Sequence, residues 1–183
     1  MYDSWRKNLE EITFAFNGLF DYVDRDTINF KPDKNSWSVG EILEHMLLVN
    51  ESYYPIFDEV AADSFDPPWF SRFEFLVDMF GRMILKSVEP ERNRKVKTLK
   101  RWKPQKSTVD FNVLDRFFKG QIILGKHLKL LIPYAEEEIV IHSPASKIIV
   151  YQIDVAIEII IAHEKRHLNQ ALEVVAILKS LKK

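Results

Sequence analysis

The sequence predicts an all-α protein, a four-helix bundle with one additional helix. Apolar residues recur at three- and four-residue steps in several segments of the 183-residue chain, which is the spacing of one face of a helix. Only five glycines occur, whereas a turn-rich β-sandwich needs many turn residues. Hydrophobic residues make up 46% of the chain, enough apolar surface for the core of one domain over residues 1–183.

The second helix has the clearest start signal in the sequence. Ser38 and Glu41 form the pattern of a capping box, in which each side chain accepts a hydrogen bond from the other residue's backbone N–H. Trp37, just before the cap, stands where a hydrophobic staple would fix the direction of the chain. This helix is expected to reach about Tyr53 and either to end before Pro55 or to continue beyond it with a kink.

The other elements follow from apolar periodicity and from proline. A break is expected at residues 66–68, a long polar loop over 89–107, and a connector over 136–146 whose residues 139–141 could form a scrap of extended chain. The remaining helices are expected over residues 3–23, 70–88, 108–132 and 148–181.

Composition excludes several classes of function. There are 26 basic and 27 acidic residues, so no net field favours nucleic acid or an anionic membrane. The chain has no cysteine, so a metal would have to be bound by histidines and carboxylates. The most apolar run, residues 155–162, contains Glu158 and is far too short to span a membrane, and the N-terminus does not have the pattern of a signal peptide. A cytoplasmic location is the expectation that follows.

Three of the five histidines form a candidate metal site. His163 and His167 lie four residues apart in the last expected helix, so both rings leave the same apolar face, one turn apart. His45 lies two turns into the capped second helix and is also expected to face the interior. Inward side chains on facing helices are how bundles build metal sites. The sequence therefore predicts one divalent metal ion on three imidazoles, with at least one coordination position open.

Two alternatives concern these histidines. A single inward histidine is more often a hydrogen-bonded core residue, although a pair on one apolar face is harder to explain in that way. Residues 163–167 also fit the zinc-peptidase pattern H-E-x-x-H, with Glu164 as general base. That class is rejected, because only 16 residues follow His167 and they offer no suitable third ligand.

Four further residues are candidates for the chemistry of the site. Glu41 and Glu164 could act as a base, although the capping box is the main role expected for Glu41. Gln170 shares the face of the two helix-borne histidines and could bond the second nitrogen of a ligand, or could be a buried polar residue at a helix contact. Arg166 could meet an anionic group of the substrate or form a surface salt bridge.

Several of these segments together resemble the DinB/YfiT-like metalloenzyme family. The matching stretches are Lys31-Pro32, Trp37 to His45, His142-Ser143-Pro144, and Ala162 to Gln170. The resemblance implies a four-helix bundle, frequently dimeric, in which His45, His163 and His167 bind nickel or zinc. Some members transfer or isomerise low-molecular-weight thiol conjugates, and others are taken to be hydrolases.

The sequence thus leads to two hypotheses for function. The first is a metal-dependent enzyme, a hydrolase or thiol transferase, that acts on a small-molecule substrate and forms a homodimer. The second is a non-catalytic bundle or binding protein in which a metal, or hydrogen-bonded histidines, ties helices together. A basic segment, Arg92 to Lys106 with Trp102 inside it, could track a phosphate backbone, but a solvated loop is the usual explanation and no nucleic-acid partner is expected.

Overall fold

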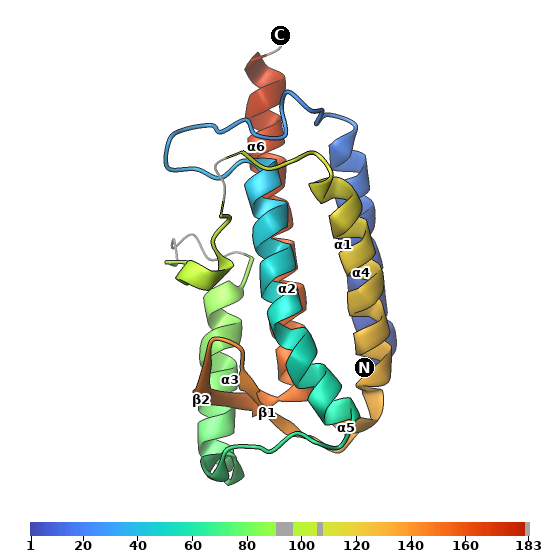
Figure 1. The fold of residues 1–183 in the computed structure, drawn as a ribbon, viewed down its shortest axis with the longest axis vertical. Coiled ribbons are helices and arrows are strands. Elements are labelled where there is room, and N and C mark those ends of the chain that lie inside the picture. Colours follow the sequence, from blue (N-terminus) through green and yellow to red (C-terminus); the bar gives the residue numbers. More distant parts are fainter. Residues whose placement is uncertain (91–96, 106–107, 182–183) are drawn as a thin grey trace.

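The computed structural model describes residues 1–90, 97–105 and 108–181, and their fold is mainly helical (Figure 1). Four long helices contact one another in a closed ring in which α1 packs on α6, α6 on α2, α2 on α4, and α4 on α1. They run side by side along the long axis of the molecule. Their bounds are α1 Tyr2–Phe20, α2 Val39–Ala61, α4 Val113–Leu130 and α6 Ile153–Leu181.

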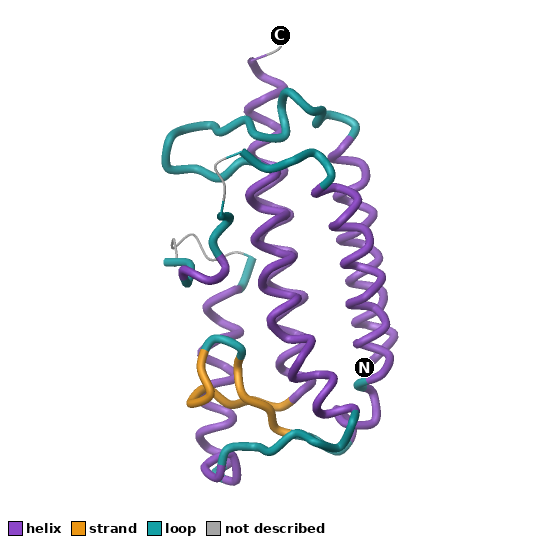
Figure 2. Tube along the Cα trace, in the orientation of Figure 1, coloured by secondary structure: helices purple, strands orange, loops and turns teal. Residues whose placement is uncertain are grey.

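The other elements pack outside this ring or at its end (Figure 2). Helix α3 lies against α6 and against the second strand of a small antiparallel hairpin. Two short 3-10 turns and one short helix are the other regular elements of the described residues. The bounds are η1 Trp69–Arg72, α3 Glu74–Val88, η2 Lys100–Trp102, α5 Ile132–Glu136, β1 Val140–Ser143 and β2 Ser146–Gln152.

Helix α1 shows why the apolar periodicity produces a bundle. Its buried side chains recur every three or four residues, so they form one stripe along the helix. That stripe faces the bundle, and the remaining positions are half-buried or exposed. Helices α2 and α6 are buried on more of their surface, because each has neighbours on several sides. The stripe of α1 consists of Trp5, Leu9, Ile12, Phe16 and Leu19.

The predicted capping box at the start of α2 is confirmed. The Ser38 side chain accepts a hydrogen bond from the Glu41 backbone N–H, and the Glu41 carboxylate accepts one from the Ser38 N–H. The helix continues through Pro55 to Ala61, so it does not stop before the proline. The apolar residues Ile56, Phe57 and Val60 beyond it are buried, and this packing outweighs the hydrogen bond that the proline removes.

The expected start of the last helix at residue 148 is wrong. Residues 146–152 instead form strand β2, which pairs with β1 so that Ile141 faces Tyr151. The run of β-branched and aromatic residues at 148–151 explains the strand, because such side chains suit a pleated surface. Tyr151 is fully buried, and its hydroxyl lies 2.8 Å from the hydroxyl of Tyr53 in α2. The extended chain expected near residues 139–141 is present as β1.

Two other helices begin later than expected. The segment from Trp69 forms a 3-10 turn before α3 begins at Glu74, and α4 begins at Val113 rather than at residue 108. Helix α4 ends at Leu130, and α5 then begins at Ile132, where Pro133 occupies a first-turn position that needs no backbone donor. Both expected helices are thus present, with shifted ends.

Among the described residues, every helix falls short of the length or the apolar character needed to cross a membrane.

Candidate metal centre

The three histidines singled out in the sequence come together inside the bundle. His45 comes from α2, and His163 and His167 come from successive turns of α6. All three are buried. Nε2 of His163 lies 3.1 Å from Nε2 of His45 and 3.1 Å from Nε2 of His167. The candidate ligand atoms of the three residues all lie within 4.8 Å of one another, so they could hold a metal ion.

Hydrogen bonds on the outer side of two rings determine which nitrogens face the centre. Nδ1 of His45 lies 2.7 Å from the backbone carbonyl oxygen of Trp102, and Nδ1 of His167 lies 3.0 Å from Oε1 of Gln170. A carbonyl oxygen can only accept, so each Nδ1 carries the proton and donates it. In the neutral rings, Nε2 of His45 and Nε2 of His167 therefore each carry a lone pair, which is directed toward His163.

This donor set fits a metal ion. Two lone pairs converge on Nε2 of His163, and a single proton on that nitrogen cannot satisfy both of them well. Within the described part of the chain, the buried Nδ1 of His163 has no hydrogen-bond partner. A tetrahedral ion with bonds of 2.0–2.1 Å sets neighbouring nitrogens about 3.3 Å apart, close to the spacing seen here. A cation at the point of convergence would accept all three lone pairs.

Burial keeps these imidazoles neutral. Loss of solvent lowers the pKa of His45 and lowers that of His163 well below its usual value. For His167, burial and then the positive charge that His45 would carry lower the pKa to about 3. A neutral imidazole is the form that binds a metal, so ligation needs no proton release from these rings near neutral pH.

An indole forms one wall of the cluster. The Trp37 ring lies 4.8 Å from the His45 ring and stacks at 6.0 Å on the ring of His167, with 20° between the planes. This residue immediately precedes the N-cap of α2, so the cap that starts the helix also places the wall. The sequence suggested Trp37 only as a staple.

Glu41 is held at the cap of α2 by two interactions. One carboxylate oxygen accepts the Ser38 N–H, and the other lies 2.7 Å from Nζ of Lys31. The side chain is buried, and both oxygens are engaged. The structure therefore gives Glu41 the capping role that the sequence favoured for it.

Glu164 leaves α6 on a different face from His163 and His167 and has different partners. Its Oε1 accepts hydrogen bonds from Asn50 of α2 at 2.7 Å and from Gln121 of α4 at 2.9 Å. The side chain is completely buried, and burial raises its pKa to about 7 despite these two donors. The structure thus places this candidate base in a polar cluster between three helices, which the sequence did not reveal.

Arg166 reaches toward the end of α3. Its Nη1 lies 3.3 Å from the carbonyl oxygen of Ser87 and 3.4 Å from that of Glu89. A cation at the C-terminus of a helix meets the negative end of the helix dipole. Gln170, by contrast, belongs to the histidine cluster through His167.

The other two histidines lie apart from the cluster. The His142 ring packs against Phe65, and His127 pairs with Asp58. In the basic segment, residues 92–96 and 106 lie outside the described residues. Its described part contributes Trp102, whose carbonyl bonds His45. That contact was invisible to sequence reasoning, because it joins positions 57 residues apart through a backbone atom.

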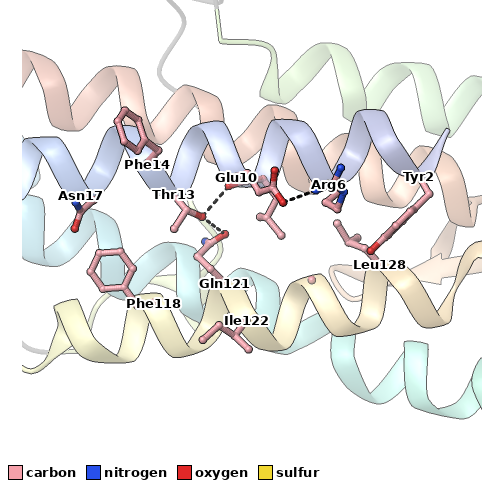
Figure 3. A pocket seen from close by; sticks show the side chains of 12 residues that line it. Tyr2, Arg6, Glu10, Thr13, Phe14, Asn17, Phe118, Gln121, Ile122 and Leu128 are labelled. Atoms are coloured by element: carbon pink, nitrogen blue, oxygen red, sulfur yellow. Dashed lines mark hydrogen bonds and ion pairs between the residues drawn. The ribbon is translucent and has the colours of Figure 1, made fainter.

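One apolar cavity lies apart from the histidines. It has a volume of about 570 Å³ and lies between α1 and α4 (Figure 3). Leu9, Phe14, Phe118 and Ile122 give it an apolar lining, and Thr13 and Gln121 meet at its polar floor. None of its lining residues belongs to the histidine cluster.

Comparisons with protein-family models, with curated proteins and with solved structures give no match for this chain.

Proposed function

We propose that this protein is a metal-dependent enzyme that binds one divalent ion, zinc or nickel, through His45, His163 and His167. The observation that carries the proposal is the convergence of three Nε2 atoms, two of them fixed as lone pairs by outer hydrogen bonds. A set of three neutral imidazoles leaves a position open, and an ion bound there supplies Lewis acidity toward a small-molecule ligand.

The proposed reaction class is hydrolysis or low-molecular-weight thiol transfer. Support comes from the resemblance to DinB/YfiT-like metalloenzymes, carried by Trp37 to His45 and Ala162 to Gln170. The closed ring of four long helices with an added helix is compatible with that resemblance. The homodimer belongs to the same proposal, and light scattering on the purified protein tests it.

A second candidate is a structural metal in a non-catalytic bundle. One observation favours it, because both candidate bases are engaged elsewhere. Glu41 bonds the cap and Lys31, and Glu164 bonds Asn50 and Gln121. In residues 1–90, 97–105 and 108–181, the cluster able to hold a metal consists of histidines alone.

The first test is metal content. The wild-type protein, purified without a tag and incubated with zinc or nickel, should retain about one equivalent of metal. His163→Ala should lose it, while His127→Ala, a histidine outside the cluster, should keep it. Retention of metal by His163→Ala would refute the site.

A second measurement separates the two candidates. Addition of a small thiol to the nickel-loaded protein should produce a thiolate-to-metal charge-transfer band if a position is open. A spectrum that the thiol leaves unchanged, together with a fall in melting temperature on metal removal, would favour the structural role.

A further inference from the structure

One short turn joins the histidine cluster to the hairpin at the end of the bundle. The turn η2, Lys100–Trp102, contacts α2, and the carbonyl oxygen of Trp102 lies 2.7 Å from Nδ1 of His45. Arg101 in the same turn reaches the loop between β1 and β2. Its Nη1 donates to the carbonyl oxygen of Pro144 at 2.8 Å, and its Nη2 donates to that of Ala145 at 2.5 Å.

A turn of this size cannot hold its own position. Two backbone hydrogen bonds define it, Trp102 N–H to Leu99 O at 3.0 Å and Lys103 N–H to Lys100 O at 3.3 Å. Its place against α2 therefore depends on tertiary contacts. The partly buried Trp102 ring supplies one, and the two charge-assisted hydrogen bonds of Arg101 supply the other.

We propose that Arg101 is a positioning residue for the metal ligand His45. Its planar guanidinium bridges two successive carbonyls of the hairpin and so fixes η2 against the bundle. The Trp102 carbonyl then stays in place to accept the His45 Nδ1 proton. The part of this proposal that concerns metal affinity rests on the proposed function, but the part that concerns the tautomer of His45 does not.

The chemistry of this arrangement follows from the two nitrogens of imidazole. A neutral imidazole carries one proton, and the hydrogen bond to Trp102 holds it on Nδ1. The Nε2 lone pair of His45 is then presented toward His163. If η2 moves away, the Nδ1 proton loses its acceptor and the ring can exchange tautomers and rotate. Partners of this kind change metal affinity by about 10- to 100-fold.

The basic segment of the sequence gains a structural role in this arrangement. In its described part, Arg101 contacts the hairpin and the Trp102 carbonyl contacts His45, a role that needs no nucleic acid. The guanidinium carbon of Arg101 also lies 5.6 Å from the centre of the Trp102 ring, so the arginine supports the ring as well as the hairpin contact.

The test compares Arg101→Ala and Arg101→Lys with Lys100→Ala, a control that removes an exposed cation from the same turn. Imidazole ¹⁵N shifts of the metal-free proteins at about pH 8 report the tautomer of His45. Competition with a chelator reports zinc affinity. We expect His45 to be protonated on Nδ1 in the wild type and in Lys100→Ala. Arg101→Ala should show mixed tautomers and zinc affinity about 10- to 100-fold weaker, with Arg101→Lys between them.

Each outcome decides between the claims. An unchanged tautomer and zinc affinity within twofold of wild type in both arginine variants would overturn the role of Arg101, and would leave the metal site standing. If the wild type binds no zinc but Arg101→Ala still changes the tautomer of His45, the role of Arg101 would be supported and the proposed function refuted. If Arg101→Ala does not fold, the tautomer in Arg101→Lys decides, since lysine keeps the charge but cannot bridge both carbonyls.

Discussion

The amide of Asn50 donates a 2.7 Å hydrogen bond to the carboxyl group of Glu164, one residue along α6 from His163. Neighbouring residues of one helix thus enter two different polar clusters. The histidines form one cluster on the side of Trp37, and Glu164 forms the other with Asn50 and Gln121. The two clusters respond in opposite ways to pH, because burial raises the pKa of the acid and lowers the pKa of the bases.

The Glu164→Gln variant should be more stable than the wild type at alkaline pH. Burial raises the pKa of Glu164 from 4.5 to about 7, so its folded-state proton stabilises the protein at low pH. That stabilisation is lost as the pH rises from 4.5 through about 7. Glutamine mimics the protonated acid and should gain of the order of 3 kcal/mol at about pH 8. Urea unfolding at about pH 5 and pH 8 measures the difference.

Glu173→Gln, an exposed position on the same helix, is the control and should change stability little at either pH. A stability gap between Glu164→Gln and wild type that does not widen with pH would contradict the expected ionisation of Glu164.

Zinc affinity should depend weakly on pH in the acidic range. Burial lowers the pKa of all three histidines, and that of His167 to about 3, so protons compete poorly with the metal. The logarithm of the dissociation constant should change by less than about one unit between about pH 5.5 and 7.5. Chelator competition across this range measures it. A change of two units or more would show that the rings titrate like exposed histidines.

Without metal, the same shifts should make the fold sensitive to acid. The unfolded histidines take up protons below their usual pKa of 6.5, whereas the folded ones remain neutral. Stability of the metal-free protein should therefore fall as the pH drops below 6.5. A saturating metal should remove this loss over the range in which it stays bound, as thermal melts with and without zinc would show. Equal losses with and without zinc would argue against ligation by these histidines.

Gln170→Ala should weaken zinc binding by about 10- to 100-fold, because His167 would lose the acceptor that fixes its Nδ1 proton. Asn169→Ala is the matched control, since Asn169 is exposed and one position away. Isothermal titration with zinc measures both. Equal affinities in the two variants would show that Gln170 does not orient the ligand.

Glu41→Gln should lower stability by about 1 kcal/mol and leave metal binding unchanged. The amide oxygen can still accept the Ser38 N–H, but the interaction with Lys31 at 2.7 Å loses its charge. Denaturant unfolding gives the stability, and zinc titration gives the binding. A large fall in turnover at unchanged stability, once a substrate is known, would instead assign Glu41 to the chemistry.

The parts of the fold that were predictable are those that depend on local sequence. The capping box at Ser38 and the buried stripe of α1 depend only on residues three or four positions apart in the sequence. The hairpin was largely missed, because residues 148–151 fit an apolar helix as well as a buried strand. Pairing of Tyr151 with Ile141 and burial against Tyr53 select the strand, and neither contact is local.

The three histidines of the candidate site were predictable from local sequence, and their distant partners were not. Spacing of four residues places His163 and His167 on one face, and the capped helix turns His45 inward. The distant partner of His45 was not predictable, because Trp102 contacts the ring through its backbone carbonyl. The partners of Glu164 depend on how α2 and α4 are rotated about their axes, which periodicity alone does not specify.

The separation of the ligands along the chain has a consequence for the timing of synthesis. His45 and His163 lie 118 residues apart. A ribosome adding about 5–20 residues per second needs roughly 6–24 s to pass from one to the other. During that interval α2 can form and pack, but its histidine has no partner on α6. At the proposed site, capture of a metal ion by all three histidines would therefore have to follow the emergence of α6.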